Sequence, residues 1–259
     1  MPLGQLLLLK TPLFILGLII VGGAVAFSIA GLLVVRHFVP HSRLKAHNDV
    51  ADPILGILGA VYAVLLAFVV VTVWQAFEKS SSGVQQEANC LADMYRDAEA
   101  FSPDFRQKSS ELLRSYRQAA VNYEWPAMAS GKASTEADKA MRQIYSLYTT
   151  YEPRSLKEQS FFDESVIKLN MLRDLREQRL LDSRTGIHPL LYFVLVVGAI
   201  AVISFTFLFG TENIKAHIVM AALLAALISL ILFTILSLDF PFTGSISVSA
   251  QSLNAVQLE

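Results

Sequence analysis

Three of the chain's five histidines lie in one short polar stretch, Arg36–Asp52, and they are the residues best suited to hold a metal ion. Imidazole and carboxylate groups are ligands that zinc and nickel accept, so His37, His41 and His47 could form such a site with Asp49. Their spacing matches no known metal motif, and histidines in a short polar loop usually bind no metal. We therefore predict no metal and no cofactor, and keep His37, His41 and His47 as the candidate ligands of a minor alternative, a metal-binding protein or membrane enzyme.

The sequence gives little support for a disulfide, for an enzymatic activity or for nucleic-acid binding. The single cysteine, Cys90, excludes an intrachain disulfide and a paired-cysteine metal site. The sequence contains no P-loop, no GxSxG, no HExxH and no calcium-binding loop motif. A formal net charge of −1 gives no bulk electrostatic attraction to nucleic acid. We therefore predict that the protein is not an enzyme and has no nucleic-acid partner.

The elements that must position any functional residue are long apolar segments. The chain is 54% hydrophobic with a mean hydropathy of +0.48, too apolar for a soluble domain of 259 residues. Segments long enough to cross a bilayer run over about residues 12–35, 53–77, 188–209 and 216–238. The first is too long for a signal peptide, so we expect it to be retained. The predicted fold class is an all-α membrane protein with four transmembrane helices.

The spans divide the chain into four parts. Residues 1–77 hold the first helix pair, 78–187 form a polar helical domain, 188–238 hold the second helix pair, and 239–259 form a tail. Four amphipathic stripes predict four helices in the polar domain, the first continuing directly from the second span. The charged run 173–177 is typical of a solvated face. Alternating polar and apolar residues at Ser245–Ser249 predict a short strand in the tail.

The orientation follows from the basic residues near the spans. Lysine and arginine are more numerous on the side of the amino terminus and the polar domain than in the two short loops. This predicts that both termini and the polar domain are cytoplasmic, in a multi-pass protein of a cytoplasmic membrane.

The second span has two unlike faces. Asp52 before Pro53 predicts a helix that begins there, with Asp52 as its amino-terminal cap. One face carries small residues suited to close helix packing: Gly56, Ala60, Ala63 and Ala67. The other carries bulky residues: Leu58, Val61, Leu65, Phe68 and Thr72. A helix that only anchors the chain does not need this division.

The spans contain no Asp, Glu, Lys or Arg, which argues against a proton-coupled transporter. Channels, in contrast, can be built from hydrophobic constrictions with polar groups at the mouth. The two-faced second span and the charge-free spans are therefore consistent with a homo-oligomeric ion channel whose partners are the bilayer and inorganic ions. The bulky face is the candidate pore lining, and the candidate outer mouth consists of His47, Asn48, Asp49 and Asp52. The alternative is a non-conducting membrane scaffold or sensor whose cytoplasmic helices bind a partner.

Several stretches resemble the bestrophin-like domain family of bacterial membrane proteins, a group largely without assigned function. They are HNDV at His47–Val50, the span Val61–Phe77, EWPAM at Glu124–Met128, and LDFPFTGSISVS at Leu238–Ser249. The resemblance implies four spans, a cytoplasmic helical domain between the second and third, and distant kinship with bestrophins, which are pentameric anion channels in animals. It therefore implies a pentamer, with the second helix lining the pore and the protein in the bacterial inner membrane.

The second span departs from the bestrophin pattern. The residues that it shares with that pattern are Leu58-Gly59, Tyr62, Trp74 and Phe77-Glu78. An arginine and one tryptophan of the pattern are missing, and the interval before Trp74 is about a helical turn longer. The constriction residues of bestrophins therefore cannot be transferred one by one. The acidic calcium-binding cluster of the animal proteins has no clear counterpart either.

Overall fold

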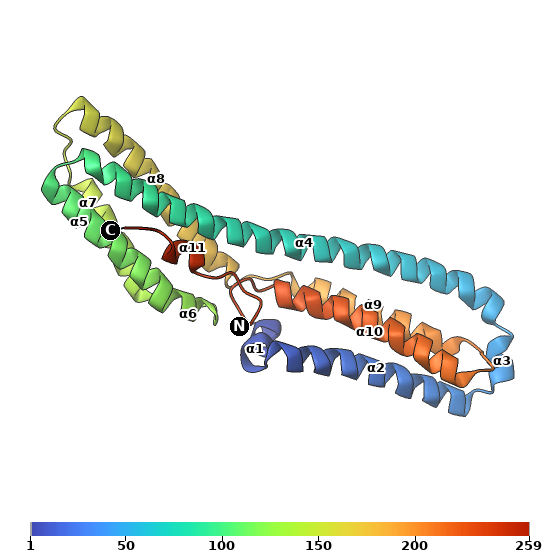
Figure 1. Ribbon diagram of the computed structural model, residues 1–259. Coiled ribbons are helices and arrows are strands. Elements are labelled where there is room, and N and C mark those ends of the chain that lie inside the picture. Colours follow the sequence, from blue (N-terminus) through green and yellow to red (C-terminus); the bar gives the residue numbers. More distant parts are fainter. Residues whose placement is uncertain (1, 259) are drawn as a thin grey trace. The chain divides into compact units, whose positions relative to one another are not determined.

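A computed structural model describes residues 2–258, with every side chain in that range except that of His41. The described residues form helices and contain no strand (Figure 1). They make up two compact units. The membrane unit consists of Lys10–Gln75 and Ile187–Asp239, and the helical unit consists of the chain up to Leu9, Ala76–Gly186 and the chain from Phe240 onward.

Among the described residues, four helices are long and apolar enough to cross a bilayer, as predicted, and their apolar segments lie in the membrane unit. These are α2 (Leu13–Phe38), the first part of α4 (Asn48–Asp97), α9 (Pro189–Phe205, extended by the 3₁₀ turn η3 at Thr206–Leu208) and α10 (Ile214–Leu238). A short helix, α3 (His41–Lys45), lies between α2 and α4. Helices α9 and α10 form a hairpin, and α10 packs along much of α2.

The predicted start of the helix that contains the second span, with Asp52 as its amino-terminal cap, was wrong. Helix α4 begins at Asn48, and Pro53 lies inside it. The Asn48 side chain fixes this start, because its amide donates to the Gly210 carbonyl and accepts from the Gly210 amide, both at 3.0 Å. Gly210 is required there, since a Cβ would collide with the backbone of Leu44 and Lys45. Pro53 removes only one helical hydrogen bond, so the helix passes through it.

The helical unit is built on the second part of α4. Helix α1 (Leu3–Lys10) begins the chain, and the 3₁₀ turn η1 (Ala98–Ala100) ends α4. The other elements are α5 (Pro103–Ala119), the π-helix η2 (Ala120–Glu124), α6 (Trp125–Met128), α7 (Thr135–Thr149), α8 (Leu156–Asp182) and α11 (Gln251–Asn254). The four predicted amphipathic helices are confirmed as the end of α4, α5, α7 and α8. Their apolar stripes meet in one core that includes Leu91, Met94, Leu113, Tyr116, Ile144 and Leu172.

The strand predicted at Ser245–Ser249 is absent from the described residues, and the tail instead packs as irregular chain and the short helix α11. Its apolar side chains join the core of the helical unit, among them Phe242, Val248 and Leu253. Side chains satisfy several of its carbonyls. Trp125 Nε1 donates to the Val248 carbonyl at 3.2 Å and Arg117 Nη1 to that of Val256 at 2.5 Å. With its apolar residues anchored in a helical core, the tail has no strand beside it to form a ladder.

Candidate functional site

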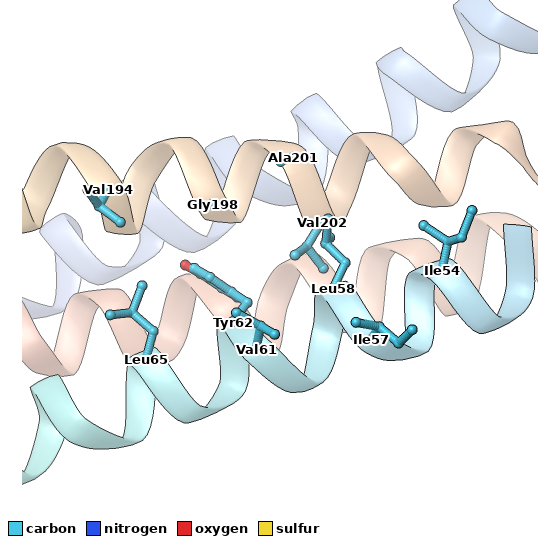
Figure 2. Close-up of a pocket in the computed structure, with 10 residues that line it drawn as sticks. All are labelled: Ile54, Ile57, Leu58, Val61, Tyr62, Leu65, Val194, Gly198, Ala201 and Val202. Atoms are coloured by element: carbon cyan, nitrogen blue, oxygen red, sulfur yellow. The ribbon is translucent and has the colours of Figure 1, made fainter.

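The face of α4 that packs within the membrane unit is neither of the two faces singled out in the sequence. Its buried residues are Tyr62, Leu66, Val69 and Val73. The Tyr62 hydroxyl donates to the Leu195 carbonyl of α9 at 2.8 Å. The tyrosine ring lies against Gly198, where a Cβ would stand 2.5 Å from Tyr62 Cε2 (Figure 2). The absence of a side chain at Gly198 therefore lets the ring of Tyr62 contact the backbone of α9.

An open apolar groove of about 470 Å³ runs between α4 and α9 beside Tyr62 (Figure 2). Three of the predicted pore residues, Leu58, Val61 and Leu65, line its α4 side. Val194 and Ala201 of α9 line the other side. The groove contains no charged residue, so it suits an acyl chain or an apolar side chain better than a hydrated ion.

The other two predicted pore residues lie outside this groove. Phe68 is 70% exposed, and Thr72 is exposed with its hydroxyl bonded to the Phe68 carbonyl at 2.8 Å. The bulky stripe is therefore divided in the single chain, with Leu58 and Leu65 half-buried and Val61, Phe68 and Thr72 uncovered. Whether any of these residues lines a pore stays a prediction.

The four small residues share one environment. Gly56, Ala60, Ala63 and Ala67 are all exposed, and a Cβ at Gly56 would meet no atom within 4 Å. Among the described residues no other helix covers these four positions, although small residues on a helix permit the close approach of a neighbour. Their role in helix packing therefore stays a prediction about a neighbouring molecule.

The predicted outer mouth lies around the first turn of α4. Asn48 is half-buried and bonded to Gly210, while His47, Asp49 and Asp52 are exposed. Of the candidate metal ligands, His37 is exposed and makes an edge contact with Phe38, and the side chain of His41 lies outside the described residues. The described side chains contain no group of three metal-ligating residues, so the metal alternative gains no support from them.

A cluster of four buried charges, missed in the sequence, lies inside the helical unit. Glu87 comes from α4, Glu124 from η2, and Arg176 and Arg179 from α8. Arg179 donates to both carboxylate oxygens of Glu87 at 2.7 and 2.9 Å, and to Glu124 at 3.0 Å. Arg176 donates to both oxygens of Glu124 at 3.0 and 2.7 Å. The two carboxylates and two guanidiniums balance, which is the condition under which buried charges are tolerated.

Aromatic residues complete this charge cluster. The Tyr116 hydroxyl donates to Glu87 at 2.7 Å, and the Arg179 guanidinium lies 4.8 Å from the centre of the Trp125 ring. Burial, assisted by the Glu87 charge, raises the pKa of Tyr116 well above its ordinary value. Burial alone would lower the pKa of Arg179, but Glu87, Tyr116 and Glu124 together raise it. The guanidinium of Arg179 therefore stays protonated, and the ion pairs of the cluster join α4, η2 and α8.

The prediction of a solvated charged run at 173–177 was therefore wrong at one position. Arg173, Asp174 and Glu177 are exposed, but Arg176 is buried. A signal for this was present, because Arg176 and Arg179 continue the buried stripe of Leu169 and Leu172 at spacings of three and four. The π-helix that carries Glu124 was not predictable in this way. It precedes Pro126, whose missing N–H prevents a regular α-helical bond to Asn122.

The four apolar helices and the helical unit define an all-helical membrane protein. Its relatives can then be given. The model of the bestrophin-like domain matches residues 22–253, and the chain belongs to that family. The likeness that the sequence suggested is thus confirmed. A comparison with curated proteins gives no match.

Two solved structures share the fold. Both are crystal structures of variants of a bacterial bestrophin homologue from Klebsiella pneumoniae. One is 9% identical, with a TM-score of 0.66, and the alignment covers 91% of this chain and 96% of that chain. The other is 10% identical, with a TM-score of 0.64, covering 91% and 97%. At these identities the likeness establishes the fold alone.

Proposed function

We propose that the protein is an oligomeric ion channel of bestrophin-like type, in which copies of α4 surround the pore. The observation that supports this proposal most directly is which faces of the membrane part of α4 are buried within the single chain and which are exposed. Only one face, centred on Tyr62 and Val69, is buried, and the small-residue face and part of the bulky face are left uncovered. Family membership and the shared fold support the same reading.

In such an assembly the two uncovered faces have different tasks. Gly56, Ala60, Ala63 and Ala67 would pack between neighbouring copies, because small residues let backbones approach closely. Leu58, Val61, Leu65, Phe68 and Thr72 would form a constriction without charges. By resemblance to bestrophins, we propose five copies, with both termini and the helical unit in the cytoplasm of a bacterial cell. We assign the protein no enzymatic activity.

Ion selectivity depends on two opposing contributions at the proposed outer mouth. The amino-terminal end of α4 carries a partial positive charge that favours anions. Asp49 and Asp52, both exposed there, favour cations. Reversal potentials measured for wild type and for Asp49→Asn/Asp52→Asn would show which contribution dominates, because removing the carboxylates can only shift selectivity toward anions.

The proposal is tested by reconstituting the purified chain in liposomes and planar bilayers. We expect ion flux above that of empty liposomes, and a changed single-channel conductance in Leu65→Ala and Phe68→Ala. Leu223→Ala is the matched control, because Leu223 of α10 is exposed (66%), as Phe68 is, but lies outside α4. If the wild-type protein passes no ions while it remains folded and oligomeric, the channel proposal fails and the non-conducting scaffold becomes the better reading.

A further inference from the structure

Helix α1 has an unusual distribution of apolar residues. Its inner face is buried in the helical unit through Gln5 and Leu8, which are 1% and 6% exposed. Its other face carries Leu3, Leu6 and Leu9, which are 77%, 37% and 41% exposed. The polar residue Gln5 is thus buried while Leu3, Leu6 and Leu9 are outside, the reverse of the arrangement expected for a helix on a water-facing surface. An apolar face of this kind indicates that something other than water covers it.

The buried face of α1 is held by specific contacts. Gln5 Nε2 donates to the Ser183 carbonyl at 3.0 Å and to the Thr243 hydroxyl at 3.1 Å, with a longer contact of 3.4 Å to the Ala129 carbonyl. Leu8 packs close to Gly244, where a Cβ would lie 3.5 Å from that of Leu8. These contacts fix the rotation of α1 within the helical unit, so that Leu3, Leu6 and Leu9 point away from the core of that unit.

The segments that hold α1 lie close in sequence to membrane spans. Ser183 is six residues before Pro189, the first residue of α9, and Thr243 is five residues after Leu238, the last residue of α10. Lys10 is three residues before Leu13, where α2 begins. Even a fully extended chain covers only about 3.5 Å per residue, so each of these links is shorter than roughly 22 Å. Three separate links therefore restrain α1 to the neighbourhood of the ends of three spans.

We propose that α1 lies in the bilayer–water interface, with Leu3, Leu6 and Leu9 inserted among the lipids. A helix in this position buries its apolar face by about 5–10 Å at the level of the headgroups and the upper acyl chains. Lys10, exposed at the end of the same helix, can reach a lipid phosphate while its alkyl chain stays in the interface. Through Gln5, the anchored helix ties the end of α8 and the start of the tail to the membrane surface. This inference requires only that the chain spans a membrane, and it stands whether or not the protein conducts ions.

The test places an environment-sensitive nitrobenzoxadiazole label on α1 of the full chain, at Leu6→Cys in a Cys90→Ala background. Leu9→Cys is the second position, in case the first variant folds poorly. The control is Leu156→Cys, since Leu156 is 92% exposed at the start of α8 in the same unit. Helix α8 has 27 residues, so Leu156 at its start lies about 40 Å from its other end, which is followed by Ser183.

The labelled proteins are reconstituted in phosphatidylcholine–phosphatidylglycerol liposomes. Nitroxide groups high on the acyl chains should quench the α1 label at least threefold more than the Leu156 label, and iodide in the buffer should quench the α1 label less. Equal access of iodide to both labels would overturn the proposal, because α1 would then face water. Protection of the α1 label from both quenchers would also overturn it, since a second copy or another part of the chain would then cover the leucines.

Discussion

Arg179 Nε and Nη2 donate to the two carboxylate oxygens of Glu87 at 2.7 and 2.9 Å, and both side chains are buried. Glu87 is part of α4, the helix that also crosses the membrane unit, and Arg179 is part of α8. The pair therefore fixes the position of the polar end of α4 within the helical unit. Glu124 and Arg176 extend the cluster and make each charge dependent on the others.

Glu87→Gln should be strongly destabilising. It leaves the Arg179 guanidinium buried with only part of its compensating charge, and breaking a buried pair in this way costs about 3–5 kcal/mol. Arg179→Gln should cost a similar amount because the buried Glu87 carboxylate then keeps its hydrogen bond from Tyr116 but loses its guanidinium partner. The double variant should cost less than the two single variants together, because both charges are gone. Unfolding of the protein in mild detergent, followed by near-ultraviolet circular dichroism, measures these differences.

The control for the charge cluster is an ion pair on the same helix. Arg173 Nε lies 3.7 Å from Glu177 Oε1, and both side chains are exposed. Glu177→Gln should therefore change the free energy of unfolding by less than about 1 kcal/mol. If Glu87→Gln is as mild as Glu177→Gln, or if the two cluster substitutions are simply additive, the pair does not have the role assigned to it.

Two glycines of the membrane unit should respond differently to substitution. Gly198→Ala should destabilise the folded chain, because the new methyl group would collide with the Tyr62 ring. Gly56→Leu should leave the fold of the single chain intact, because a Cβ at Gly56 would meet no other part of the described chain within 4 Å. If the small face packs between copies, Gly56→Leu should weaken assembly. Thermal stability and native mass spectrometry separate the two effects, and unchanged assembly in Gly56→Leu would contradict the packing proposed for this face.

Asp239 should make stability depend on pH. Burial raises the pKa of its carboxyl above the ordinary value of 3.8, although hydrogen bonds from the Ile187 amide and the Tyr192 hydroxyl act in the other direction. The native state then binds the proton more tightly than the unfolded state, so the stability contributed by Asp239 is greatest at low pH and is lost as the pH rises through the raised pKa.

Asp239→Asn removes this titration and retains a side chain of the same shape. The stability of the variant relative to wild type should therefore improve from about pH 4 to about pH 7. Melting temperatures of both proteins across this range measure the effect. A difference that stays constant with pH would show that the native and unfolded carboxyls titrate alike.

Much of the fold could be predicted from the sequence because its signals are local. An uninterrupted apolar run marks each span, and repeats at three and four residues mark α5, α7 and α8. The start of α4 was predicted wrongly because Asn48 is fixed by Gly210, which is 162 residues away in the sequence. The prediction of a strand in the tail was wrong for a similar reason. Contacts with the helical core, rather than the local alternation of polar and apolar residues, determine where Val248 lies.

The candidate site was less predictable than the fold. The packed face of α4 is defined by the contact between Tyr62 and Gly198, which belongs to α9 and lies far from α4 in the sequence. No pattern within α4 shows that these two residues meet. The charge cluster depends on a π-helix that turns Glu124 inward. Helical spacing could have placed Arg176 and Arg179 on the buried stripe, but it could not have identified the carboxylates that make their burial possible.

The central claim, that copies of α4 surround a pore, is tested most directly by the arrangement of the chains in a lipid nanodisc, determined by electron cryomicroscopy. We expect a closed ring of copies in which α4 is the helix nearest the axis, with Leu65 and Phe68 toward the opening and Gly56 and Ala60 between neighbours. A monomer, or an oligomer with α4 on its lipid-facing perimeter, would contradict the account.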